Sequence, residues 1–144
     1  AAYRLDTAPM MKTVVAGRAS DDMRLLRDVC RDLFDAITTM MRPGNTFDEA
    51  ARAAEAVLAP HIDRVFFSGV FGYAVGAQFP PSWVEGSGYI ACGQPREFET
   101  DMVFHLPLCL RLPGQWGIGI SDTVRVTAGG GEALTDNDWE LAQV

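Results

Sequence analysis

The first regular pattern along the chain is a run of apolar side chains at helical spacing. From Leu26 to Met40 they recur every three or four residues, and charged side chains occupy the opposite face. Ser20 precedes the run as a candidate N-cap. Pro43 must end the helix, because proline lacks an amide donor and restricts the residue before it. The pattern predicts one packed amphipathic helix between Ser20 and Arg42.

A second helix is expected directly after this break. Thr46 and Glu49 have the spacing of a capping box, in which the threonine oxygen accepts an amide hydrogen and the glutamate reaches back to the N-cap. Alanine-rich sequence continues to Leu58, and Pro60 ends the helix. The two predicted helices are therefore consecutive and joined by a short turn.

The later part of the chain has the apolar and β-branched composition of strands. Residues 101–111 and 116–127 are separated by a Pro-Gly turn over residues 112–115, so they predict a long antiparallel hairpin. Residues 132–135 predict a last short strand after a run of glycines. Residues 8–15 predict a strand entering the sheet near the start of the chain. Together these segments predict one α+β domain.

Composition and charge exclude several classes of protein. The 144 residues are 48% hydrophobic, which is enough for a buried core. The formal net charge is −7 and the basic residues form no stripe, so a nucleic-acid or membrane partner is not expected. Three cysteines without a C-x-x-C pair are expected to be reduced and buried: Cys30, Cys92 and Cys109. With no apolar span or leader in view, we expect a soluble, cytoplasmic protein.

Several short motifs follow one another in an order that resembles the carboxyl-terminal part of the pita-bread superfamily. They are Lys12-Thr13, Arg42 to Thr46, Gly72 to Gly76, Asp101 to Phe104, Ile120 to Thr127 and Glu132 to Thr135. This superfamily contains methionine aminopeptidase, prolidase, aminopeptidase P, creatinase and ectoine hydrolase. The resemblance covers residues 3–136. It implies a partial pita-bread fold, with a helix pair packed on a curved, largely antiparallel sheet. It also implies that residues 1–144 are the carboxyl-terminal part of a catalytic domain whose first half is missing.

The metal-binding positions of the family's peptidases carry other residues here. By resemblance, their second aspartate falls on Pro9, their histidine on Tyr73, and their two glutamates on Pro107 and Ser121. Proline has no ligand atom in its side chain, and isolated hydroxyls hold a divalent ion poorly. The resemblance therefore implies a metal-independent protein with no cofactor, and it argues against a metal-dependent Xaa-Pro peptidase.

Among the superfamily members that work without metal, ectoine hydrolase is the most similar in motif. Its Gly-Tyr-x-Ile-Gly, Tyr-Pro-Pro-x-Trp-x-Glu and Gly-Met-x-Phe-His-Phe stretches are similar to Gly72 to Gly76, Phe79 to Glu85 and Met102 to Leu106. This likeness implies a full-length hydrolase that cleaves a C–N bond in a small non-peptide compound, ectoine-like or creatine-like. It further implies a homodimer, and we expect residues 1–144 alone to be inactive.

Five residues are candidates for the site. His105 lies in an apolar strand, where it is either a proton shuttle or substrate ligand, or a structural hydrogen-bonded residue. Glu85 follows apolar residues that would raise its pKa toward acid–base use, although solvated loop glutamates are common. Asp122 could bind a substrate cation or orient His105. For substrate binding, Tyr73 offers a hydroxyl and Trp83 a cation–π wall, and both could instead be packing residues.

Two functions of different classes remain open at this point. One is the metal-independent hydrolase just described, with a small-molecule substrate and its main acid–base residue upstream of this chain. The other is a catalytically inactive pita-bread module. In this reading the metal ligands were lost when the domain became a binding or interaction protein. The upstream gene sequence separates them, because an in-frame first half with a histidine supports the enzyme.

Overall fold

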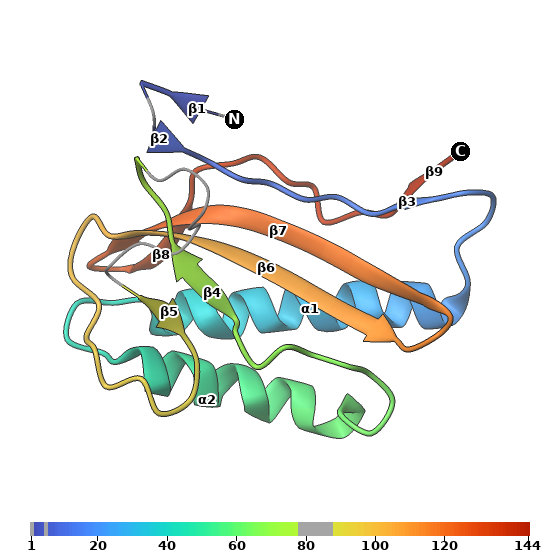
Figure 1. Cartoon of the computed structure of the whole chain (residues 1–144), viewed down its shortest axis with the longest axis horizontal. Helices are drawn as coiled ribbons and strands as arrows, with labels where there is room; N and C mark the ends of the chain where they lie inside the picture. Colours follow the sequence, from blue (N-terminus) through green and yellow to red (C-terminus); the bar gives the residue numbers. More distant parts are fainter. Residues whose placement is uncertain (1, 5, 78–87) are drawn as a thin grey trace.

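A five-stranded sheet covered on one side by two helices forms the centre of the molecule (Figure 1). The computed structural model describes residues 2–4, 6–77 and 88–144. The strands lie in the order β5-β4-β6-β7-β8, and neighbouring strands are antiparallel. The strand bounds are Gly72–Ala74 for β4, Tyr89–Ile90 for β5, Val103–Leu112 for β6, Trp116–Thr127 for β7 and Gly130–Ala133 for β8.

The two helices begin at the caps that the sequence predicts. Helix α1 spans Asp21–Met40, and the Ser20 hydroxyl accepts the amide hydrogen of Met23 at 3.2 Å. Helix α2 spans Phe47–Leu58, and its capping box is complete. A short 3-10 helix over Ala59–His61 follows, with proline in its first turn. Local capping chemistry thus fixes where the helix pair starts and turns.

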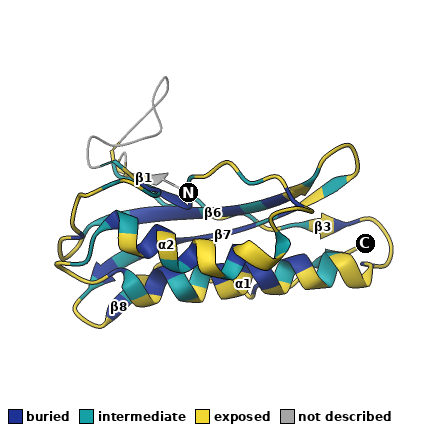
Figure 2. Ribbon diagram, turned by 90° about the horizontal axis from the view of Figure 1, so that it is seen from below, coloured by how far each residue is buried: buried dark blue, intermediate teal, exposed yellow. Residues whose placement is uncertain are grey.

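The β6–β7 hairpin separates two kinds of side chain. Cross-strand partners project to the same face of a sheet, and successive residues project to opposite faces. Phe104 pairs with Val124 and faces the helices, whereas His105 pairs with Thr123 and faces away from them. Figure 2 shows both strands largely buried along their length. The core toward the helices consists of Phe104, Leu106, Leu108, Leu110, Ile118, Ile120, Val124 and Val126, with the apolar face of α1 and α2.

The segment near the start of the chain lies along the outer edge of β7. The Ser121 amide donates to the Met11 carbonyl at 3.1 Å, and the Thr123 hydroxyl donates to the Pro9 carbonyl at 2.7 Å. The expected strand over residues 8–15 is too long, because only Val14–Val15 (β3) forms one. Proline offers no amide donor at position 9, and side-chain hydroxyls replace ladder bonds there.

Two small sheets complete the fold. Strand β3 pairs in parallel with β9 (Ala142–Gln143), and β1 (Ala2–Tyr3) pairs with β2 (Asp6–Thr7) as an antiparallel ribbon. Both ends of the chain run along the β7 side of the sheet (Figure 1), and the carboxyl-terminal segment also contacts α1, where the Phe34 and Trp139 ring centroids are 4.6 Å apart. The last strand of the main sheet, β8, begins at Gly130, two residues earlier than the sequence predicts.

The cysteines are only partly as expected. All three are free, but only Cys30 is buried, whereas Cys92 and Cys109 are half-buried. Burial raises the pKa of the Cys30 thiol to about 12, so this thiol is inert at neutral pH. Among the described residues, no helix is long and apolar enough to cross a membrane.

We predict that Gly72→Ala destabilises the fold, because a Cβ there would lie 2.5 Å from Leu106 Cδ2 and 3.0 Å from the His105 carbonyl oxygen. Leu106 is fully buried and cannot move aside freely. The expected loss is about 1–3 kcal/mol of unfolding free energy, measured by urea denaturation. Gly129→Ala is the control, since its Cβ meets only Thr127 Oγ1 at 3.8 Å. Equal effects of the two substitutions would contradict this packing account.

Candidate active site

Three hydrogen-bonding side chains lie side by side across neighbouring strands, on the sheet face away from the helices. Tyr73 on β4 is the cross-strand partner of His105 on β6, and Ser121 comes from β7. The Tyr73 hydroxyl is 2.7 Å from His105 Nδ1, and Ser121 Oγ is 2.7 Å from His105 Nε2. We call this arrangement the Tyr73–His105–Ser121 relay.

The inner part of the relay is buried and carries no charge at neutral pH. His105 is 3% exposed and Ser121 is fully buried. Burial lowers the pKa of His105 to about 4, because the imidazolium would lose its hydration without gaining a counter-ion. His105 is therefore neutral at pH 7, with one ring nitrogen donating and the other accepting.

The outer end of the relay is the hydroxyl of Tyr73, whose side chain is half-buried. Partial burial raises its pKa, so the phenol keeps its hydrogen at neutral pH. Ser121 Oγ accepts the Met11 amide hydrogen at 2.7 Å and can donate its own hydrogen to His105 Nε2. In that arrangement His105 Nδ1–H donates to the Tyr73 oxygen. The Tyr73 hydrogen is then free to donate to a bound molecule.

Asp122 lies on the opposite face of the sheet. It pairs with Leu106, so its side chain projects toward the helices. Its two oxygens accept hydrogen bonds from Thr135 Oγ1 at 2.6 Å and from Trp139 Nε1 at 3.0 Å. Burial raises its pKa, and these two bonds oppose that rise. The structure thus does not bring Asp122 to His105, and its contacts anchor the carboxyl-terminal segment.

Two candidates from the sequence cannot be placed. Glu85 and Trp83 lie outside the described residues. In the sequence, Ser121 stands out only as a position where the resemblance implies the loss of a metal ligand, and the structure adds it to the relay. The available signal is strand alternation, which places Ser121 on the same sheet face as Thr123, the cross-strand partner of His105.

The four positions that the sequence resemblance assigns to the peptidases' ligands lie in the relay or beside it. Tyr73 and Ser121 are part of it, Pro107 is the cross-strand partner of Ser121, and Pro9 lies on the segment along β7. Within the described ranges, no group of three or more histidine, cysteine, aspartate or glutamate side chains could hold a metal ion. Two hydroxyls and a hydrogen-bonded imidazole do not fit a divalent ion.

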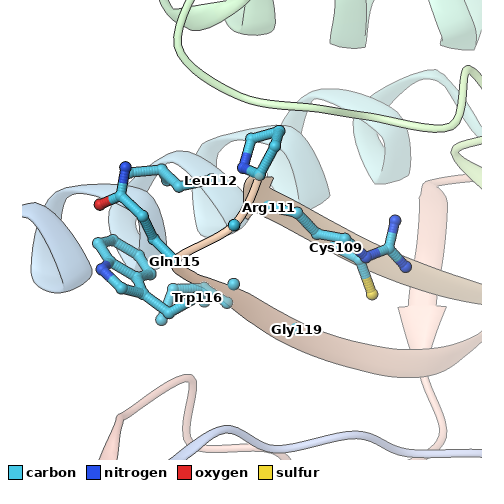
Figure 3. Close-up of a pocket in the computed structure, with 10 residues that line it drawn as sticks. Cys109, Arg111, Leu112, Gln115, Trp116 and Gly119 are labelled. Carbon is cyan, nitrogen blue, oxygen red and sulfur yellow. The ribbon is translucent and has the colours of Figure 1, made fainter.

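Two hollows flank the relay on this face of the sheet. One, of about 410 Å³, reaches Val103 and Thr123, immediately beside His105. The larger one, of about 540 Å³, lies at the turn of the β6–β7 hairpin, where Figure 3 shows the side chains of Cys109 and Arg111. Its lining residue Gly119 is two residues from Ser121 on β7, so this hollow lies toward the Ser121 end of the relay. The smaller hollow includes Thr123, the cross-strand partner of His105, and lies beside the imidazole.

Curated proteins with related sequences include hydrolases. The ectoine hydrolase of Halomonas elongata is 27% identical over 144 residues, which cover 96% of this chain and 34% of that protein. The uncharacterized hydrolase/peptidase y4tM of Sinorhizobium fredii is 30% identical over 139 residues, covering 93% of this chain and 33% of that protein. The chain thus spans about a third of the length of these relatives.

Solved structures share the fold. Dipeptidase PepE from Mycobacterium ulcerans is 26% identical with a TM-score of 0.80, over 94% of this chain and 35% of that one. Prolidase from Pyrococcus furiosus is 21% identical with a TM-score of 0.81, over 94% of this chain and 39% of that one. The expected helix pair on an antiparallel sheet is confirmed as the fold fragment of prolidase-like enzymes.

The family assignment follows from the sequence and agrees with this fold. The profile of metallopeptidase family M24 matches residues 1–128, which is most of the chain. The chain belongs to metallopeptidase family M24.

Proposed function

We propose that the full-length protein containing this chain is a metal-independent hydrolase of a small non-peptide substrate, ectoine-like or creatine-like, with a scissile C–N bond. The observation that carries the proposal is the Tyr73–His105–Ser121 relay. The sequence resemblance assigns Tyr73 and Ser121 to positions of the peptidases' metal ligands, and the relay offers a neutral hydrogen-bond donor there.

The similarity to ectoine hydrolase supports the substrate class. That relative is 27% identical across almost the whole chain. We propose that the Tyr73 hydroxyl donates a hydrogen bond to the polar atom of the bond being cleaved. His105 is a positioning residue, because its Nδ1 sets the direction of the Tyr73 hydrogen. Glu85 and Trp83 are proposed to help hold the substrate, as the sequence resemblance implies.

The relay accounts for only part of the reaction. Hydrolysis adds water across the C–N bond, and the departing nitrogen must gain a proton while the attacking water loses one. A neutral imidazole between two hydroxyls cannot hold the water's proton easily at neutral pH, since the pKa of His105 is about 4. We therefore propose that the main acid–base residue belongs to a part of the full-length protein outside this chain, and that the protein works as a homodimer in the cytoplasm.

We predict that full-length protein hydrolyses ectoine or creatine and keeps its turnover after exhaustive dialysis against EDTA. The dipeptide Gly-Pro should be a poor substrate, and added Mn²⁺, Co²⁺ or Zn²⁺ should not stimulate cleavage. Product formation by mass spectrometry measures all three. Metal-restored cleavage of Gly-Pro would contradict metal independence. Binding of the small compounds without any turnover would favour the inactive-module alternative.

We predict that Tyr73→Phe lowers kcat by roughly 10²-fold while changing KM little, because the lost hydrogen bond acts on the bond being cleaved. Steady-state kinetics on full-length protein measures the two constants. Tyr89→Phe is the matched control, since Tyr89 lies opposite Tyr73 on β5 and its hydroxyl contacts only the Gln94 amide among the described residues. A drop in kcat of the same size for both variants would mean that the Tyr73 hydroxyl has no special role.

We predict that His105 makes stability depend on pH between about 4 and 6.5. In this window the unfolded chain binds a proton that the folded His105 does not, so unfolding free energy falls as pH falls. The pKa difference corresponds to about 3 kcal/mol. Asp122, whose pKa is raised, changes stability in the opposite direction.

Urea denaturation at a series of pH values measures this dependence. His105→Gln should flatten the change in unfolding free energy between pH 7 and 4.5, while His61→Gln, at a half-buried position outside the relay, should leave it as in the parent chain. A slope unaffected by His105→Gln would show that His105 is not held neutral by burial.

A further inference from the structure

One side chain of the carboxyl-terminal segment joins the two backbone segments that meet at the relay. The carboxyl-terminal segment and the segment near the start of the chain run beside each other along β7 (Figure 1). Asn137 Nδ2 donates to the Met11 carbonyl at 2.9 Å and to the Ser121 carbonyl at 3.1 Å. Ser121 is a member of the relay, and the Met11 amide donates to its hydroxyl. The Asn137 amide therefore acts on the backbone immediately behind the relay.

The bond from Asn137 to the Ser121 carbonyl accompanies an unusual pairing of Met11 with Ser121. These two residues form an antiparallel bridge. In a regular hydrogen-bonded pair, two such residues exchange both of their N–H···O=C bonds. Here the Ser121 amide donates to the Met11 carbonyl at 3.1 Å, but the Met11 amide donates to Ser121 Oγ at 2.7 Å. Asn137 thus occupies the carbonyl to which the Met11 amide would donate in a regular pair.

The direction of the Met11 amide bond decides the direction of the whole relay. An amide N–H can only donate, so Ser121 Oγ accepts it and keeps its own hydrogen for His105 Nε2 at 2.7 Å. An accepting ring nitrogen carries no hydrogen, so the neutral imidazole carries its hydrogen on Nδ1, which faces the Tyr73 oxygen at 2.7 Å. If the Met11 amide donated to the carbonyl instead, Ser121 Oγ could accept from Nε2–H. The Tyr73 hydrogen would then be used inside the relay.

Asn137 is itself held in a single orientation. Its Oδ1 accepts the amide hydrogen of Trp139 at 3.2 Å, which forms an Asx turn. Trp139 has a φ of 56°, in the left-handed region that residues other than glycine rarely adopt. Its ring is anchored, because Nε1 donates to Asp122 at 3.0 Å and the ring centroid lies 4.6 Å from that of Phe34. With Oδ1 engaged by an N–H donor, Nδ2 must face the two carbonyls.

We propose that Asn137 is a positioning residue that sets the tautomer of His105 through the Met11 amide and the Ser121 hydroxyl. It keeps the hydrogen of the imidazole on Nδ1 and leaves the Tyr73 hydrogen free for a bound molecule. The inference deepens the proposed hydrolase function and rests on it only for the effect on turnover. The tautomer itself is a property of the 144-residue chain.

An isosteric substitution tests the proposal. Asn137→Asp keeps the acceptor for the Trp139 amide and removes both donors. By long-range ¹H–¹⁵N NMR at pH 7, the parent chain should carry the His105 hydrogen on Nδ1. Asn137→Asp should shift the tautomer ratio toward Nε2–H by about 5-fold or more, as loss of one hydrogen bond implies. Asn45→Asp is the matched control, because Asn45 Nδ2 donates to the Met40 carbonyl at 2.9 Å, away from the relay. A tautomer ratio that Asn137→Asp leaves unchanged would overturn the proposal.

Two further measurements separate this mechanism from a general effect of charge or of misfolding. In a Ser121→Ala background the route through the hydroxyl is gone, so adding Asn137→Asp should not change the tautomer ratio again, and a further change would count against the proposal. In the parent chain, scalar coupling across hydrogen bonds should join the Ser121 nitrogen to the Met11 carbonyl carbon. A coupling between the Met11 nitrogen and the Ser121 carbonyl carbon would show a regular pair and refute the mechanism without any variant.

The turnover of full-length protein separates this inference from the proposed function. Asn137→Asp should lower kcat about 10-fold relative to Asn45→Asp and leave KM unchanged, because the Tyr73 hydrogen is no longer available to the bond being cleaved. A tautomer shift in a protein that hydrolyses neither ectoine nor creatine leaves the role of Asn137 standing and removes the hydrolase. Hydrolysis together with a tautomer ratio unaffected by Asn137→Asp keeps the hydrolase and removes Asn137 as a positioning residue.

Discussion

The alternation of side chains along the β6–β7 hairpin is the constraint on which the rest of the structure depends. Each strand contributes side chains to both faces of the sheet. Phe104 and Leu106 face the helices, while His105 between them faces the other way. A shift of one residue would exchange the two sets and place the imidazole in the apolar core. The hydrophobic core therefore fixes the register of the hairpin. The register in turn places the side chains of His105 and Ser121 on the same face of the sheet.

Burial on both faces explains the chemistry of the relay. A charged histidine at this depth would lose hydration without a partner, so the fold keeps His105 neutral and satisfies both ring nitrogens with hydroxyls. The same rule applies on the opposite face, where Asp122 is satisfied by Thr135 and Trp139. Two polar clusters thus lie on opposite faces of one hairpin. The relay faces away from the helices, and the contacts of Asp122 hold the carboxyl-terminal segment.

Local signals in the sequence predicted much of the fold. The caps at Ser20 and Thr46 are side-chain-to-backbone contacts within one turn, so they are visible in a short window of sequence. The path of residues 8–13 is decided by contacts with β7, more than a hundred residues away, and no local pattern encodes these. For the same reason the role of Ser121 emerged only in three dimensions. Tyr73 and His105 were identified by resemblance, whereas the separation of Asp122 from His105 follows from strand alternation that the sequence already contained.

The central claim is that the site holds a neutral, metal-free imidazole between two hydroxyls. Long-range ¹H–¹⁵N NMR of the His105 ring, at pH 7 with and without Zn²⁺, tests it most directly. The account predicts one protonated and one unprotonated ring nitrogen, unchanged by the metal, with no imidazolium signal down to about pH 5. Two protonated nitrogens at pH 7, or a Zn²⁺-dependent shift of either nitrogen, would contradict it.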